Sequence, residues 1–366
     1  MAESESESTS IDIISELPKG LQCKILSYLP FKEAVATSIL SKSWMSLSLS
    51  GAPSLDFSDG IQIPKSLKYL LFRKLRYRRF ARSVNSALDR CLAAEEPEPE
   101  VFGGFRLKCG LKSVPSKDVS RWIHTAVQVL GVEVLDFSLF FRRRISLAPD
   151  VFTSERMVVL RLEGIFVQSN IDSVWLPSLK ILHMRNVGFW STDCVLNLMG
   201  GCKNSVEELV LDLVGFSSWG GITWGPHERF PRLIRVTSNY SLHFRHFIPF
   251  KAFANAEVLQ KTPVRGITLD VSLWKDLPIF DDLSVPSHLK RCYFRGFDTL
   301  VRQICLVGFA KRILENGRMM ERITISCRVS KKQYWKNILT SFTRSSPACQ
   351  FKFEHFTCSF DDRQVW

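Results

Sequence analysis

The sequence predicts an α/β fold, in which a short all-helical N-terminal module precedes an irregular solenoid with a parallel sheet. An apolar stretch at 11–49 has helical spacing, and a short apolar motif recurs through most of the remaining chain. Over 366 residues, 45% apolar and 23% charged side chains are ordinary for a folded protein with a large core. We expect five segments: an acidic, disordered lead at 1–10, the helical module at 11–51, a basic helical linker with an acidic loop at 52–100, the repeats at 101–285, and a C-terminal cap at 286–366.

The stretch 11–49 is predicted to begin with a short helix. Leu17 and Pro18 open this helix, because the fixed φ of proline suits a first helical turn, and Pro30 stops it. Between them, apolar side chains recur at helical spacing and form one stripe. The members of the stripe are Leu21, Ile25, Tyr28 and Leu29.

A second helical run is predicted at 32–39, and Leu40 and Trp44 follow it, four residues apart on one helical face. Some forty residues in short helices cannot bury this much apolar surface by themselves. The stripe therefore either packs on the rest of the chain or is kept for another protein.

This stretch resembles an F-box, and the matching pieces are Leu17-Pro18, 25–30 and 37–44. In that family the module binds a Skp-type adaptor, which connects it to a cullin-based ubiquitin ligase. The resemblance implies the same partner here, held by an apolar anchor cluster. That cluster would be Leu17, Pro18, Ile25, Leu26, Leu29, Leu40 and Trp44. The family usually has a basic residue just before the Trp, and this chain has Ser43 there, so we expect weaker adaptor binding.

The net charge of +13 is concentrated in 61–82, which carries eight basic residues and no acid. We predict a helix over 65–92 and a solvated acidic loop over 93–100. Three interpretations of the basic run stay open: a solvated helix face, a nuclear-localisation or nucleic-acid patch, and an amphipathic helix that lies on a surface. We favour the solvated face, because charge runs usually are solvated. The third interpretation would use Leu75, Tyr77 and Phe80.

From residue 102 onward the motif apolar-x-x-apolar-x-apolar recurs nine times, at spacings of 22 to 31 residues. This is the range of leucine-rich repeats. In such a repeat the alternating positions form a short strand, and the stacked strands make a parallel sheet that buries one side. The consensus asparagine is missing from most units, so we expect non-uniform curvature. The middle apolar positions are Phe105, Leu135, Leu160, Leu182, Leu209, Val236, Ile267, Cys292 and Ile323.

The repeat region also resembles the plant F-box/FBD/leucine-rich-repeat family, on WIHTAVQVLGVEVLDF at 122–137 and VLRLEG at 159–164. Residues 289–326 resemble the FBD module of the same family, which would cap the solenoid. The resemblance implies a substrate-recognition adaptor of an SCF-type ubiquitin ligase. Its F-box would dock on a Skp-type subunit, and its solenoid would capture an unknown target protein for ubiquitination. Such a chain is a non-catalytic subunit without a cofactor, working in the nucleus, the cytoplasm or both.

No catalytic residue or metal ligand is predicted from the sequence. Of seven histidines, only His243 and His246 pair at short spacing, and two nitrogens alone do not make a structural zinc site. The ten cysteines form no C-x-x-C pair, and the acidic start is unlike a signal peptide. We therefore expect reduced, mainly buried thiols in an intracellular protein. No run of 18 or more apolar residues occurs, so no membrane span is expected.

The candidate target-binding residues are Trp219, Trp224, Arg142, Arg143 and Arg144. Loop aromatics and arginines are typical of recognition surfaces, and we expect the arginine triple just after a strand, near the concave rim. Two alternative functions stay open. One is an F-box receptor that senses a small ligand in a basic pocket, with Arg161 and Arg185 as further candidates. The other is a nucleic-acid-associated protein that uses the basic segment 65–82.

Overall fold

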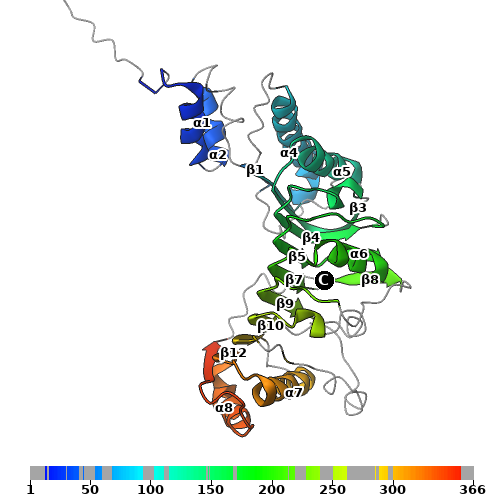
Figure 1. The fold of residues 1–366 in the computed structure, drawn as a ribbon. Helices are drawn as coiled ribbons and strands as arrows, with labels where there is room; N and C mark the ends of the chain where they lie inside the picture. Colours follow the sequence, from blue (N-terminus) through cyan, green and yellow to red (C-terminus); the bar gives the residue numbers. More distant parts are fainter. Residues whose placement is uncertain are drawn as a thin grey trace, which may run out of the picture.

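The computed structural model shows a small helical piece beside an elongated stack of strands (Figure 1). Within the described part of the chain, no helix is both long and apolar enough to cross a membrane. The described residues are 13–14, 16–29, 31–40, 44, 54–59, 68–93, 103–110, 115–145, 147, 149–167, 171–212, 214–218, 228–239, 250–261, 285, 288–295 and 300–355.

The N-terminal piece contains the predicted short helices, and we refer to its described residues 13–44 as the helical module. Helix α1 (Lys19–Ser27) begins directly after Pro18, which has an extended conformation with ψ of 141°. Helix α2 (Phe31–Ala36) runs into a 3-10 turn, η1 (Thr37–Ile39). The expected arrangement of this module is therefore confirmed.

The remaining chain forms a long sheet in which every described strand pair is parallel, which confirms the predicted fold class. The main path of neighbouring strands follows the order of the chain. The strands on this path are β1 (Ser54–Ser58), β2 (Gly104–Cys109), β3 (Val134–Ile145), β4 (Val159–Val167), β5 (Ile181–Arg185), β7 (Glu208–Asp212), β9 (Arg235–Asn239), β10 (Val258–Lys261), β11 (Arg291–Arg295), β12 (Arg322–Cys327) and β13 (Gln350–His355).

One row of apolar residues runs in register through all of these strands, and its members are buried except for the half-buried last one. Because the row is continuous, each strand covers its neighbour, as expected for a solenoid. The row is Leu55, Phe105, Leu135, Leu160, Leu182, Leu209, Val236, Leu259, Cys292, Ile323 and Phe351.

Two strands in this row differ from the sequence prediction. The expected motif around Ile267 lies outside the described residues, and the strand between β9 and β11 is β10, which contributes Leu259. Strand β1 contributes Leu55 from a segment that we expected to be linker. The sheet therefore begins immediately after the helical module.

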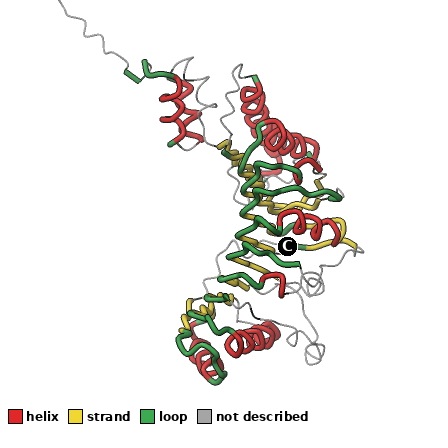
Figure 2. The backbone as a smooth tube through the Cα atoms, in the orientation of Figure 1, coloured by secondary structure: helices red, strands yellow, loops and turns green. Residues whose placement is uncertain are grey.

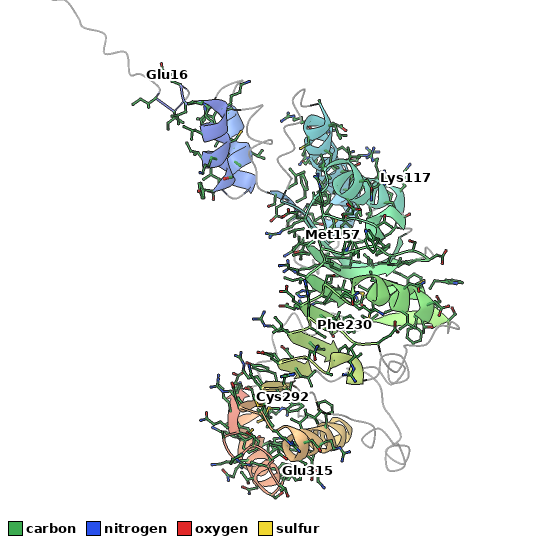
Figure 3. All side chains as sticks on the ribbon, viewed as in Figure 1. Glu16, Lys117, Met157, Phe230, Cys292 and Glu315 are labelled. Atoms are coloured by element: carbon green, nitrogen blue, oxygen red, sulfur yellow. The ribbon has the colours of Figure 1, made fainter. Side chains whose placement is uncertain are left out.

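Helices lie along one side of the strands (Figures 1 and 2). Helix α4 buries Ala81, Val84 and Leu88, and its Phe80 meets Trp122 of α5 edge to face, with ring centroids 6.1 Å apart. The helical segments are α4 (Lys68–Leu92), α5 (Ser116–His124) with its π-helical continuation η2 (Thr125–Val129), η3 (Pro149–Phe152), α6 (Thr192–Cys202), η5 (Phe250–Phe253), α7 (Leu300–Asn316), η7 (Val329–Lys331) and α8 (Lys332–Thr340). The sheet face opposite these helices is called the open face below.

A short second ladder branches from the main sheet where the register of β3 and β4 shifts, between Ser138 and Arg143. Beyond the shift, β4 pairs with β6 (Gly188–Ser191), which pairs with β8 (Gly215–Ser218). Gly164 sits at the bend of β4 with φ of +69°, and a Cβ there would collide with the backbone of Leu139, so only glycine fits.

Candidate interaction surfaces

The helical module has two apolar faces, and only one of them is buried. Leu26, Ala34 and Trp44 form a small core, with exposed fractions of 0, 0 and 4%. Leu21 and Ile25 lie on the other face of α1 and are 50 and 43% exposed. Of sixteen exposed large apolar side chains in the described chain, seven belong to this module, which indicates an interaction surface. The seven are Ile13, Ile14, Leu21, Ile25, Tyr28, Ile39 and Leu40.

The structure divides the predicted adaptor-binding residues into two groups. Pro18, Ile25 and Leu40 are exposed, so a partner can reach them directly. Leu26 and Trp44 belong to the module's own core, where they hold α1 and α2 in place. Leu17 and Leu29 are half-buried, and Ser43 lies outside the described residues. Helical spacing is compatible with either face of α1 being buried, so only the exposure of each side chain in the structure separates the two groups.

Five exposed apolar residues of the helical module were not among the predicted adaptor-binding residues: Ile13, Ile14, Leu21, Tyr28 and Ile39. Leu21, Ile25 and Tyr28 are spaced by four and three residues, which places them on one helix face. That spacing was visible in the sequence, but it did not reveal which face points outward.

The helical module contacts the solenoid through α2 and β1. Val35 of α2 is half-buried and packs on the main core of the solenoid, rather than on the small core of the module. The contact lies at the first strand of the sheet, so the module adjoins the N-terminal end of the solenoid (Figure 1).

A chain of polar contacts, which we call the charge ladder, crosses five adjacent strands on the open face. Arg161 Nη1 lies 3.8 Å from Asp136 Oδ2, and Arg161 Nε donates a hydrogen bond of 3.3 Å to His183 Nδ1. His183 Nε2 lies 2.7 Å from Glu208 Oε1, and Arg235 Nη1 lies 3.3 Å from Glu208 Oε2. Each charged group in the ladder thus has an opposite or polar neighbour on the next strand.

His183 is the neutral centre of the charge ladder. Burial lowers the pKa of His183, and Arg161 lowers it further against the opposing effect of Glu208. Since Arg161 donates to Nδ1, the ring proton resides on Nε2 and is donated to Glu208. Burial raises the pKa of Glu208, but the hydrogen bonds from His183 and Arg235 outweigh this and lower it overall.

The basic run lies on α4, and its described side chains form a solvated face of this helix. Arg76, Arg78, Arg79 and Arg82 are exposed, as the favoured interpretation requires. Of the three residues that a surface-lying helix would use, Tyr77 and Phe80 are half-buried against the main core and Leu75 is 47% exposed. The Tyr77 hydroxyl donates to Asp118 of α5, and burial together with this hydrogen bond raises the pKa of Tyr77.

The described cysteines have the properties of core thiols. All eight cysteines whose side chains are described are free and six of them are buried, in agreement with the expected reduced, mainly buried thiols. Burial raises the pKa of Cys91 to about 11 and that of Cys202 to about 12. Within the described ranges, no group of three or more His, Cys, Asp or Glu side chains is placed to hold a metal ion.

The structure describes the backbone of three of the five predicted target-binding residues, Arg142, Arg143 and Arg144. Trp219, Trp224 and the pair His243/His246 lie outside the described residues. The arginine triple 142–144 was expected just after a strand, but its backbone lies inside β3, near the register shift. Of the two further pocket candidates, Arg161 belongs to the charge ladder, and Arg185 is exposed on β5.

Comparison with known proteins identifies the helical module: residues 14–51 match the F-box domain family. A putative F-box/FBD/LRR-repeat protein of Arabidopsis thaliana is 31% identical over 233 residues, which cover 63% of this chain and 43% of that protein. A putative F-box protein of the same plant is 34% identical over 224 residues, covering 57% of this chain and 42% of the relative. An F-box/LRR-repeat protein of this plant is 31% identical over 209 residues, covering 57% of this chain and 41% of the relative.

The chain thus spans about two-fifths of the length of these curated relatives. The matched F-box at 14–51 lies within the module expected at 11–51, and the relatives are plant proteins of the kind that the sequence resembles. These findings confirm the resemblance that was drawn from the sequence.

Proposed function

We propose that this chain, with an F-box domain at 14–51 ahead of an α/β solenoid, is the substrate-recognition adaptor of an SCF-type ubiquitin ligase. The F-box match carries the proposal, and plant relatives named F-box/LRR-repeat proteins support it. The F-box would dock on a Skp-type subunit, and through it on a cullin. The solenoid would hold the target protein.

The exposed apolar face of the module is the docking surface in this proposal. Ile25 and Leu40, which are 43 and 70% exposed, would be buried by the Skp-type subunit together with Pro18. Burying such side chains is worth roughly 1.5–3 kcal/mol each. Leu26 and Trp44 would act indirectly, because they fix the helices that present this face.

The contact between α2 and β1 would let the adaptor hold its target at a defined position relative to the F-box. Val35 packs on the solenoid core, and this contact holds the F-box next to the sheet. A target bound to the solenoid would be held near the ubiquitin-charged enzyme, which replaces a bimolecular encounter with an effectively intramolecular one. Trp219, Trp224 and 142–144 stay candidates for target binding.

The proposal assigns the chain no covalent step of its own. Ubiquitin transfer through a thioester needs a reactive thiolate, whereas burial raises the pKa of Cys91 and Cys202 far above neutral pH and keeps these thiols protonated. The free thiols also fit the proposed location in the nucleus, the cytoplasm or both. No cofactor is required by this mechanism.

Co-purification with a Skp-type subunit tests the proposal. Ile25→Glu together with Leu40→Glu should abolish co-purification, because both charges would be desolvated in the interface. Ile234→Glu is a matched control, since Ile234 on the solenoid is 42% exposed and Ile25 is 43% exposed. The control variant should co-purify normally. Full binding by the double variant, or by Leu17→Ala with Pro18→Ala, would contradict the assignment of this surface.

A further inference from the structure

Two arginines lie side by side at the C-terminal end of the open face. Arg291 of β11 and Arg322 of β12 are register partners on adjacent parallel strands, and both are exposed. Neighbouring strands are about 4.8 Å apart, so the two backbone positions hold like charges close together. Like charges directly opposite each other destabilise a sheet unless something neutralises them.

These arginines continue the same row of the open face as Glu208 and Arg235, which interact with each other. Toward the N-terminal end, the charge ladder satisfies its own charges. Among the described residues, no acidic side chain lies within ion-pair distance of Arg291 or Arg322. The open face therefore changes from self-neutralised to cationic along the solenoid.

The nearest acids do not remove this excess charge. Glu257 is engaged by Lys290 at 3.1 Å, and Glu354 is engaged by Lys352 of the same strand at 2.9 Å. Glu321 precedes Arg322 in the chain and is exposed, and among the described residues its carboxylate makes no ion pair with Arg291 or Arg322. Its row is the one that holds Glu257 and Lys290, beside the row of the two arginines.

We propose that Arg291 and Arg322 form a binding site for an acidic peptide segment of the target protein. The planar guanidinium group binds carboxylates through two parallel hydrogen bonds, and such charge-assisted pairs are the strong ones. Tyr293 lies on the same strand, half-buried, between Gln260 and Thr324 in register. It adds an amphipathic aromatic side chain of the kind that anchors protein partners.

An acidic peptide fits this surface better than a nucleic acid does. Nucleic-acid binding usually relies on many phosphate contacts from clustered basic side chains. Here two arginines, which make no ion pair with a described residue, are flanked in their row by the neutral Val258 and Gln350. A short peptide with a few carboxylates matches this small cationic area. The inference rests on the proposed function and extends it by naming the chemistry of the target.

Fluorescence anisotropy with the full chain bound to a Skp-type subunit tests the proposal. The probe is a short labelled peptide rich in Asp and Glu, and its Asn/Gln counterpart is the neutral probe. Arg291→Gln with Arg322→Gln should weaken binding of the acidic probe roughly tenfold or more, as expected for lost charge-assisted hydrogen bonds. Arg78→Gln with Arg82→Gln removes the same charge from α4, where both arginines are exposed, and should leave binding unchanged.

Three results would overturn the proposal: equal binding of the neutral probe, loss of binding in the α4 control pair, or equally tight binding of duplex DNA that is lost in the same variant. Co-purification of the Skp-type subunit separates this inference from the proposed function. If the subunit binds and the acidic probe does not, only the peptide site is wrong. If the wild-type chain fails to bind the subunit, the adaptor function is wrong. A normal unfolding midpoint for Arg291→Gln/Arg322→Gln excludes misfolding as the cause.

Discussion

The F-box domain and the solenoid treat their apolar residues in opposite ways. The solenoid buries a continuous row from Leu55 to Ile323, because each parallel strand covers the next. The F-box buries only Leu26, Ala34 and Trp44 in a core of its own, and seven large apolar side chains of the module stay exposed. The described strands of the solenoid cover one another, whereas the F-box exposes an apolar face that, in the proposed function, a partner protein would cover.

The difference follows from geometry. A strand in a stack has apolar neighbours on both sides, so one apolar row is enough to build a core. Two short helices bury one stripe each, and a further stripe on α1 is not covered by any described element. The same side-chain chemistry therefore serves stability in one region and, in the proposed function, binding in the other.

The largest expected effect is the loss of a side chain from the solenoid row. Leu209→Ala should destabilise the protein by about 2–5 kcal/mol, because a fully buried leucine leaves a cavity between Leu182 and Val236. Ile25→Ala, on the exposed face of α1, should change stability by less than about 0.5 kcal/mol. Urea unfolding of both variants measures the contrast. Equal destabilisation would show that the exposed face of α1 packs on the protein itself.

The F-box core can be broken separately. Trp44→Ala removes the largest member of a three-residue core, at a cost of about 3–5 kcal/mol, which a module of this size cannot absorb. Limited proteolysis should then cleave within 19–36, while the unfolding midpoint of the solenoid changes little. Trp175→Ala is the control, since Trp175 is 57% exposed on the solenoid. Continued protection of α1 in Trp44→Ala would contradict a separate F-box core.

The sequence predicted what periodicity can determine, namely the short helices and most strands of the solenoid. Strand β10 was missed because its third motif position is Lys261, so the apolar pattern is incomplete there. Strand β1 was not counted among the repeats because the long helix α4 separates it from the next strand, β2. Three consecutive arginines at 142–144 hid the second half of β3, since they break the alternation expected of a strand.

The functional surfaces needed three-dimensional information. The F-box resemblance placed Ile25 and Leu26 in one candidate cluster, although Ile25 is 43% exposed and Leu26 is fully buried. Arg161 was singled out as a possible pocket residue, but its link to His183 depends on the register between β4 and β5. Register couples residues about 22 positions apart, and no local pattern reveals it.

A smaller effect on stability is expected from the charge ladder, where the solenoid pairs polar groups instead of burying apolar ones. The folded state lowers the pKa of His183, so the unfolded chain binds more protons just below the ordinary histidine pKa of 6.5. Stability should be full above that value and fall as the pH decreases, and the lowered pKa of Glu208 adds a further loss at lower pH.

His183→Gln should reduce the loss of stability that is expected just below the ordinary histidine pKa. Urea unfolding midpoints at about pH 7.5 and pH 5.5 would measure this change. His124→Gln is the control, because His124 is exposed at the end of α5. An equal pH dependence in the wild type and in His183→Gln would show that the charge ladder does not control it.

The smallest expected effect concerns α4, which connects the two regions in sequence but packs with the solenoid. Arg78→Gln with Arg82→Gln should change the free energy of unfolding by no more than about 0.5 kcal/mol, because both side chains are exposed and the buried face of the helix is untouched. The wild type should also leave random duplex DNA unshifted at low salt. A shift that weakens with salt and disappears in this variant would instead make α4 a nucleic-acid surface, as the alternative interpretation of the basic run predicts.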